Sequence, residues 1–164
     1  MLLNNFSNIL SAKLTTTGTS SDKVNYIKTT DGTIYENSIR TSEIYLYKVP
    51  TSGSTYPELS GIKLVLANDE SEIPVNYYDY EIDNIDDQLT EIATTINKSN
   101  NYIVSKIVKN NTTNNISINT IGVIVHCYIN NNNTFKDILI YKIKSDTPII
   151  IEQGKTKTFT ITIG

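Results

Sequence analysis

Apolar and polar residues alternate along much of this chain, most regularly near its end. Between residues 155 and 163 the two sets of alternate positions are Lys157, Phe159, Ile161 and Ile163 against Thr156, Thr158, Thr160 and Thr162. A period of two residues is typical of a β-strand with one buried face. The pattern therefore predicts a half-buried strand over residues 155–163.

Shorter runs of the same kind predict further strands over residues 24–29, 33–35, 43–49, 62–67, 89–97, 102–109, 116–129, 135–143 and 147–151. Residues 102–109 also match a helical stripe, but their β-branched side chains favour a strand. Residues 116–129 fit one long strand or a bent pair. Within residues 89–97, strict alternation places Thr90, Ile92, Thr94 and Ile96 on one face and Glu91, Ala93 and Thr95 on the other. The acidic, tyrosine-rich residues 77–88 receive no assignment.

Turn residues separate these runs. Asp31-Gly32 predicts a hairpin, because glycine accepts the positive φ that such a turn requires. Asparagine-rich turns are predicted at residues 110–115 and 130–134, a hinge at residues 152–154, and a hairpin turn at Gly154-Lys155-Thr156. Short, regularly punctuated strands with little helix predict an all-β protein, an antiparallel β-sandwich rather than alternating β/α units.

The first residues are the exception to the β pattern. Their large apolar residues recur at helical spacing: Leu2, Leu3, Phe6, Ile9, Leu10 and Leu14. We expect a short amphipathic helix over residues 2–13, followed by a polar link at residues 15–21. This predicts an N-terminal helix or arm over residues 1–21 and a β-sandwich domain over residues 22–164, with a further candidate boundary in the loop 50–61. A helix this short needs a partner surface, either its own domain or another chain.

Composition narrows the function classes. The chain has 164 residues and a net charge of −3, and its lysines are scattered, so we expect one core and no nucleic-acid binding. The single cysteine, Cys127, excludes an internal disulfide and a cysteine-cluster metal site. The N-terminal residues fit neither a signal peptide nor a membrane span. We therefore expect a protein made in the cytoplasm, without a membrane partner.

Candidate chemistry is sparse. His126 and Cys127 are adjacent, but neighbouring side chains on a strand project to opposite faces, so we expect Cys127 in the core, His126 partly exposed, and no catalytic pair. Gly154-Lys155-Thr156 lacks the upstream glycine of a phosphate-binding loop. The sequence thus predicts no catalytic and no cofactor-binding residue, and hence no enzyme.

Five acidic residues lie close together in the sequence: Asp79, Glu81, Asp83, Asp86 and Asp87. Their oxygens are a ligand type that calcium prefers, but the spacing does not match an EF-hand loop and no glycine lies among them. We expect a solvated acidic loop and no metal site. The tyrosines, eleven in number, suit strands and also interfaces.

Three stretches resemble a group of small structural proteins of tailed bacteriophages. The opening Leu3-Asn4-Asn5-Phe6, with Leu10 and Leu14, resembles their short N-terminal "NFxxxL" helix. Asp79-Tyr80-Glu81-Ile82 resembles their "DYxLE" element. Residues 107–123 and 148–163 resemble their closing strands, which end in "PVTIxxGESxTFTYTI", although Thr120 stands where those proteins have a glutamate.

The resemblance implies an immunoglobulin-like β-sandwich and a non-enzymatic virion component, favouring a capsid decoration or accessory protein made in the host bacterial cytoplasm. Its partners would be other virion proteins, with the major capsid protein favoured, and copies of itself in a homo-oligomer or symmetric array. An anchoring surface is expected at Leu2, Leu3, Phe6, Ile9 and Leu10. Two alternatives stay open: a tail, collar or fibre component, and a carbohydrate-binding surface module.

Overall fold

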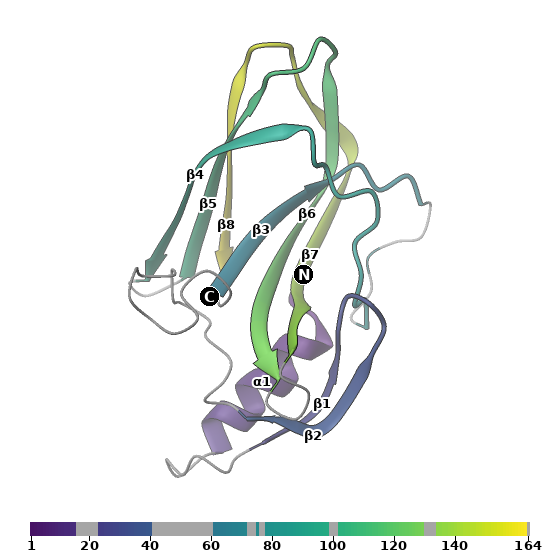
Figure 1. The fold of residues 1–164 in the computed structure, drawn as a ribbon, viewed down its shortest axis with the longest axis vertical. Coiled ribbons are helices and arrows are strands. Elements are labelled where there is room, and N and C mark those ends of the chain that lie inside the picture. Colours follow the sequence, from purple (N-terminus) through teal and green to yellow (C-terminus); the bar gives the residue numbers. More distant parts are fainter. Residues whose placement is uncertain are drawn as a thin grey trace. The chain divides into compact units, whose positions relative to one another are not determined.

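The computed structural model describes residues 1–15, 23–40, 61–71, 75, 78–98, 102–129 and 134–163 (Figure 1). Within them lie helix α1 (Asn4–Thr15) and strands β1 (Lys23–Lys28), β2 (Ile34–Arg40), β3 (Gly61–Ala67), β4 (Leu89–Lys98), β5 (Tyr102–Asn110), β6 (Ile116–Ile129), β7 (Thr134–Ile151) and β8 (Thr156–Ile163). The all-β prediction is confirmed: strands dominate, and β1 with β2, β4 with β5 and β5 with β8 pair antiparallel. The strand predicted at 43–49 lies outside the described residues, as does nearly all of the loop 50–61.

The strands form three sheets, with the orders β1-β2, β3-β6-β7 and β4-β5-β8. The predicted hairpin at Asp31-Gly32 is the β1-β2 connection, where Gly32 has a φ of +83°. The predicted hairpin before the last strand is wrong, because β8 pairs with β5 and not with β7. The turn at Gly154, with a φ of +74°, instead joins strands of two different sheets.

Strand β7 is one element where the sequence predicts two. The sequence predicts strands over residues 135–143 and 147–151 with an interruption at the polar residues 144–146, yet β7 runs from Thr134 to Ile151. It lies at the edge of the sheet β3-β6-β7, so one of its sides has no neighbouring strand. Exposed polar residues and Pro148 are tolerated there, because proline cannot donate a backbone hydrogen bond to a neighbour. Strand β6, which the sequence left open as one long strand or a bent pair, is a single strand at the centre of this sheet.

Strand β4 departs from strict alternation. Its register with β5 shifts between Glu91 and Ala93, which is the mark of a β-bulge. The bulge brings Glu91 to the face of Lys106, with Nζ and Oε2 3.0 Å apart, and leaves Ile92 55% exposed. The predicted grouping of Ile92 with Thr94 is therefore wrong, since an extra residue reverses the faces on one side of a bulge.

The chain divides into two compact units built from interleaved segments. Unit 1 consists of Met1–Lys63, Pro74–Ile82 and Val123–Lys142, and unit 2 of Leu64–Ile73, Asp83–Gly122 and Ile143–Gly164. This division differs from the predicted one at residue 21, because α1 belongs to the same unit as β1 and β2. Strands β3, β6 and β7 each contribute residues to both units.

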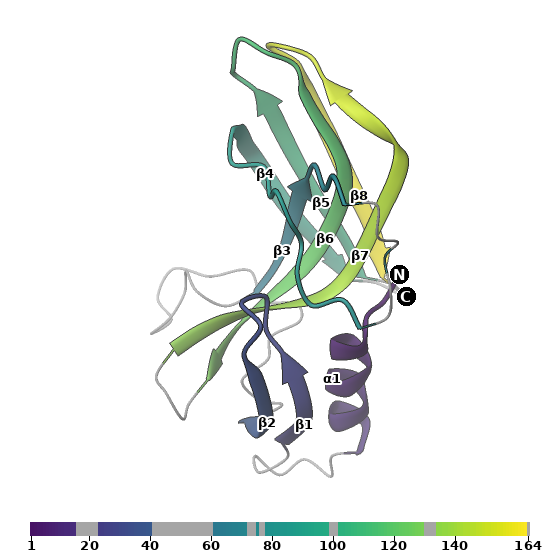
Figure 2. The ribbon, with the colours of Figure 1, turned by 90° about the vertical axis from the view of Figure 1, so that its right-hand side faces the viewer.

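In unit 1, α1 lies beside β1 (Figure 2). Residues 1–3 pair with β7: Leu3 N donates to Ile140 O at 3.0 Å and Lys142 N to Met1 O at 3.1 Å. The helix begins where Leu3 O accepts Phe6 N, at 3.0 Å. The core of this unit includes Leu3, Ile9, Ile27, Val123, Ile124, Val125, Ile138, Leu139 and Ile140.

In unit 2, β4, β5 and β8 lie side by side (Figure 1), with alternate residues of β8 buried as predicted. Lys106 Nζ on β5 donates to Leu64 O on β3 at 3.2 Å, so the inner face of this sheet meets the other strands of the unit. The core includes Leu64, Leu66, Val104, Val108, Ile116, Ile118, Ile151, Phe159, Ile161 and Ile163.

Candidate functional site

The N-terminal stripe predicted as an interface is partly enclosed by the chain itself. Leu3 and Ile9 have no exposed area, while Leu2 and Phe6 are half-buried. The side chain of Leu10 lies outside the described part of the chain. A partner approaching this stripe could therefore contact Leu2 and Phe6, but not Leu3 or Ile9.

The polar side of α1 has a structural task that the sequence did not reveal. The side chain of Asn5, 3% exposed, makes three hydrogen bonds. Its Nδ2 donates to Lys28 O at 2.8 Å and to Leu139 O at 3.1 Å, and its Oδ1 accepts Lys28 N at 3.1 Å. One turn later, Asn8 Nδ2 donates to Tyr26 O at 2.9 Å. Both amides thus bind backbone groups of β1.

His126 belongs to a polar pair rather than to a pair with Cys127. Its Nδ1 hydrogen-bonds to Asp137 Oδ1 across β6 and β7. The imidazole is only 14% exposed. The side chain of Cys127 is not among those the structure describes, so its predicted burial stays a prediction. The sequence analysis did not identify Asp137, which is one of several charged residues along β7.

An ion pair of unit 1 between Asp31 and Lys136 fixes the β1-β2 turn. Asp31 Oδ2 accepts from Lys136 Nζ, and Asp31 Oδ1 accepts Thr29 Oγ1 at 2.6 Å and Thr33 N at 3.1 Å. The hydrogen bond from Lys136, followed by those from the threonines, holds the pKa of the Asp31 carboxyl well below its usual range. The same contact raises the pKa of Lys136. Asp31 is exposed and Lys136 is only half-buried, so this pair orients the turn more than it stabilises the fold.

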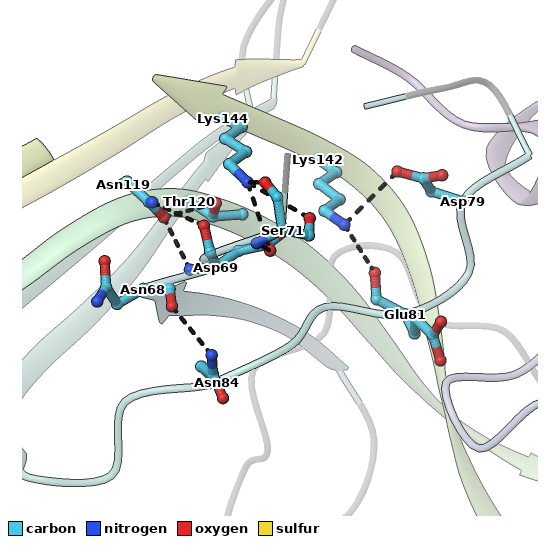
Figure 3. Close-up of polar contacts among 10 residues, drawn as sticks. All are labelled: Asn68, Asp69, Ser71, Asp79, Glu81, Asn84, Asn119, Thr120, Lys142 and Lys144. Atoms are coloured by element: carbon cyan, nitrogen blue, oxygen red, sulfur yellow. Dashed lines mark hydrogen bonds and ion pairs between the residues drawn. The ribbon is translucent and has the colours of Figure 1, made fainter. Parts of the chain in front are cut away.

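Lys142 of β7 is a buried cation of unit 1. Its Nζ lies 3.5 Å from Asp79 Oδ2 and donates to Glu81 O at 3.2 Å (Figure 3). Only 9% of its side chain is exposed. Lys142 therefore ties residues 79–81 to β7, and Asp79 serves as its counter-ion.

Asp69 is the corresponding buried anion of unit 2, with 2% of its surface exposed. Its Oδ1 lies 3.4 Å from Lys144 Nζ and accepts Ser71 N at 2.9 Å (Figure 3). Asn119 holds the backbone of the same residue: Asp69 N donates to Oδ1 and Nδ2 donates to Asp69 O, each at 2.8 Å. Next to Asn119, Thr120 is fully buried and donates to Asn119 Oδ1 at 2.9 Å.

Lys144→Met should lower the free energy of unfolding by about 2 kcal/mol, because it removes the cation beside an almost fully buried carboxylate. Asp69→Asn in the same background should cost less than in the wild type, giving a coupling of about 1 kcal/mol in a double-mutant cycle measured by urea unfolding. Additive effects of the two substitutions would show that the ion pair does not contribute.

The five acidic residues near residue 80 have separate roles. Asp79 faces Lys142, while Asp86 Oδ1 accepts Leu89 N at 2.8 Å and Gln88 N at 3.1 Å at the start of β4. Glu81, Asp83 and Asp87 are exposed. Among the residues described, no three His, Cys, Asp or Glu side chains gather as a metal site would require.

None of the helical residues that the structure describes forms a helix long and apolar enough to cross a bilayer.

The outer face of the β4-β5-β8 sheet is the most distinctive surface of unit 2. Residues opposite one another in an antiparallel pair share a face, so the register defines its members. We name it the threonine face: Thr90, Ala93, Thr95, Asn97, Ile103, Ser105, Ile107, Lys109, Thr156, Thr158, Thr160 and Thr162. Ser105 Oγ and Thr160 Oγ1 lie 3.0 Å apart on it. Lys109 is its single charged member, and every member is exposed or half-buried.

Comparison of the chain with protein-family models, curated proteins and solved structures gives no match.

Proposed function

We propose that this chain is a non-enzymatic structural protein of a tailed-phage virion, with an immunoglobulin-like β-sandwich, that decorates or stabilises the head by binding the major capsid protein. The proposal begins from the resemblance of residues 3–14, 79–82, 107–123 and 148–163 to small phage structural proteins. The chain would act by covering a surface of its neighbours, with no chemical step.

The threonine face is the observation that carries this proposal. Solvent-facing sheet surfaces commonly bear charges, which keep them apart from other proteins. Here one lysine is accompanied by threonine, serine and isoleucine residues on three strands. Hydroxyl and methyl groups can be desolvated at much lower cost than charges, so this face is suited to contact with another protein.

The size of the face favours binding through many copies. Three strands about 4.8 Å apart and eight residues long, at about 3.4 Å each, cover roughly 390 Å². A standard interface buries about 800 Å² on each partner, so one such contact is weak. Contacts repeated around a symmetric shell gain strength through effective concentration. A capsid supplies that repetition.

The proposal is tested by cosedimentation of the purified protein with capsids of the phage that encodes it, before and after capsid expansion. We expect saturable binding at a fixed ratio to the major capsid protein. Thr95→Glu adds a charge to the threonine face and should weaken binding about tenfold. The matched control Ser145→Glu, an exposed position of β7 outside that face, should bind as the wild type does.

Other outcomes would replace this proposal. Binding to isolated tails but not to heads would favour a tail, collar or fibre component. Binding to a glycan array without binding to either particle would favour a carbohydrate-binding module. Equal capsid binding by both glutamate variants would remove the threonine face from the interface.

A further inference from the structure

In the two three-stranded sheets of the described residues, three of the four edge strands are protected. The outer edge of β3 is covered by residues 84–86, through hydrogen bonds from Asn68 N to Asn84 O at 3.1 Å and from Asp86 N to Leu66 O at 2.8 Å. In unit 1, residues 1–3 cover β7 at residues 140–142. The part of β7 that belongs to unit 2 contains Pro148, which cannot donate a backbone hydrogen bond to a further strand. Strand β4 has its bulge at residues 91–93. These devices commonly prevent one sheet from pairing with another.

Strand β8 has none of these devices. Its register with β5 is continuous from Thr156 to Ile163, without a bulge or a proline. Among the described residues no segment pairs with its other edge. A long, regular, uncovered edge strand is a template for pairing with a further strand.

The phase of the β5-β8 ladder identifies the backbone groups at that edge. Asn110 N donates to Lys155 O at 3.0 Å, so Lys155 and every second residue after it direct their backbone groups toward β5. The intervening residues therefore direct their N–H and C=O groups toward the open edge: Thr156, Thr158, Thr160 and Thr162. These are the four threonines of β8 on the threonine face.

We propose that β8 pairs antiparallel with β8 of a second copy of this chain, about a two-fold axis at Thr160. In this register Thr160 lies opposite its own symmetry mate, and Thr158 lies opposite Thr162. On the inner face, Phe159 lies opposite Ile161 and Lys157 opposite Ile163. Threonine pairs and aromatic-aliphatic pairs are favourable across strands, and no charge faces a like charge.

The expected dimer is weak. Three hydrogen-bonded pairs give about six inter-chain hydrogen bonds, which is less than a standard interface provides. It should therefore dissociate on dilution and form where copies are concentrated. This inference goes beyond the proposed function: it names a surface and a partner, and it holds wherever the protein assembles.

Sedimentation analysis of the full chain over micromolar to millimolar concentrations tests the proposal. We expect a monomer-dimer equilibrium that Thr160→Lys weakens at least about tenfold, because two ammonium groups would face each other at the axis. The matched control is Thr95→Lys, in the same cross-strand row on the far strand β4, which should leave the equilibrium unchanged.

A disulfide test checks the register directly. Residues in a hydrogen-bonded antiparallel pair have Cα atoms about 5.5 Å apart, within the range of a disulfide. In a Cys127→Ser background, Thr160→Cys should yield a covalent dimer on mild oxidation and Thr95→Cys should not. A chain that stays monomeric throughout, or a dimer that neither Thr160 variant affects, would overturn the proposal; capsid binding would be untouched by that result.

Discussion

Replacing Asn5 by alanine is expected to lower the free energy of unfolding by about 3 kcal/mol, as measured by urea unfolding. The Asn5 amide satisfies Lys28 O, Lys28 N and Leu139 O from a position that is 3% exposed. Alanine would leave these three backbone groups without their partner, and each unsatisfied buried group costs about 1 kcal/mol or more. The loss should exceed what a surface substitution on a helix produces.

Two further variants separate hydrogen bonding from packing at this position. Asn5→Asp keeps the shape but loses both donors, so it should destabilise at least as much as alanine does. Asn8→Ala removes a single half-exposed hydrogen bond, to Tyr26 O at 2.9 Å, and should cost about 1 kcal/mol. Equal small losses for Asn5→Ala and Asn8→Ala would show that the buried amide is not needed.

Phe159→Ala should lower the free energy of unfolding by about 4 kcal/mol, because it removes a large side chain from the core of unit 2. Phe159 is 4% exposed and faces the interior of the unit from β8. Its loss creates a cavity that the neighbouring β-branched residues cannot fill without shifting. Thermal and urea unfolding would both report the change.

The control for this substitution is one residue away. Thr158 is exposed on the opposite face of β8, so Thr158→Ala should change the stability by less than about 0.5 kcal/mol. Comparable losses at the two positions would mean that β8 is not half-buried as its alternation indicates.

The alternation of β8 is also where sequence reasoning worked best. Phe159, Ile161 and Ile163 are buried, and the four threonines at the alternate positions of the strand are exposed, as predicted. The β1-β2 hairpin followed from Asp31-Gly32, because its turn chemistry is local. The pairing of β8 could not be predicted from the sequence. Strand β8 pairs with β5, about fifty residues earlier, and the turn after β7 has no residue pattern that indicates this partner. The bulge in β4 was also hidden, because an inserted residue leaves the composition of a strand unchanged.

The contacts of the candidate sites were the least predictable. The apolar stripe identified Leu3 and Ile9, which are buried, but it gave no sign that Asn5 is buried as well. Its partner Leu139 lies 134 residues away, and only the tertiary fold brings the two together. Asp69 and Lys144, likewise, are ordinary charged residues in the sequence. The spacing of apolar and polar residues along the chain predicts which residues are buried, but the partners of a polar residue depend on the complete fold.

The interleaving of the two units determines when each of them can fold during synthesis. Unit 1 needs Val123–Lys142 and unit 2 needs Ile143–Gly164, so neither unit can close until these late segments have left the ribosome. Until β7 has been synthesised, the apolar side chains of α1 would remain exposed to solvent or bound by a chaperone. Such long-range closure predicts folding in milliseconds to seconds, slower than for chains with local contacts, and it leaves apolar surface exposed until the late segments arrive.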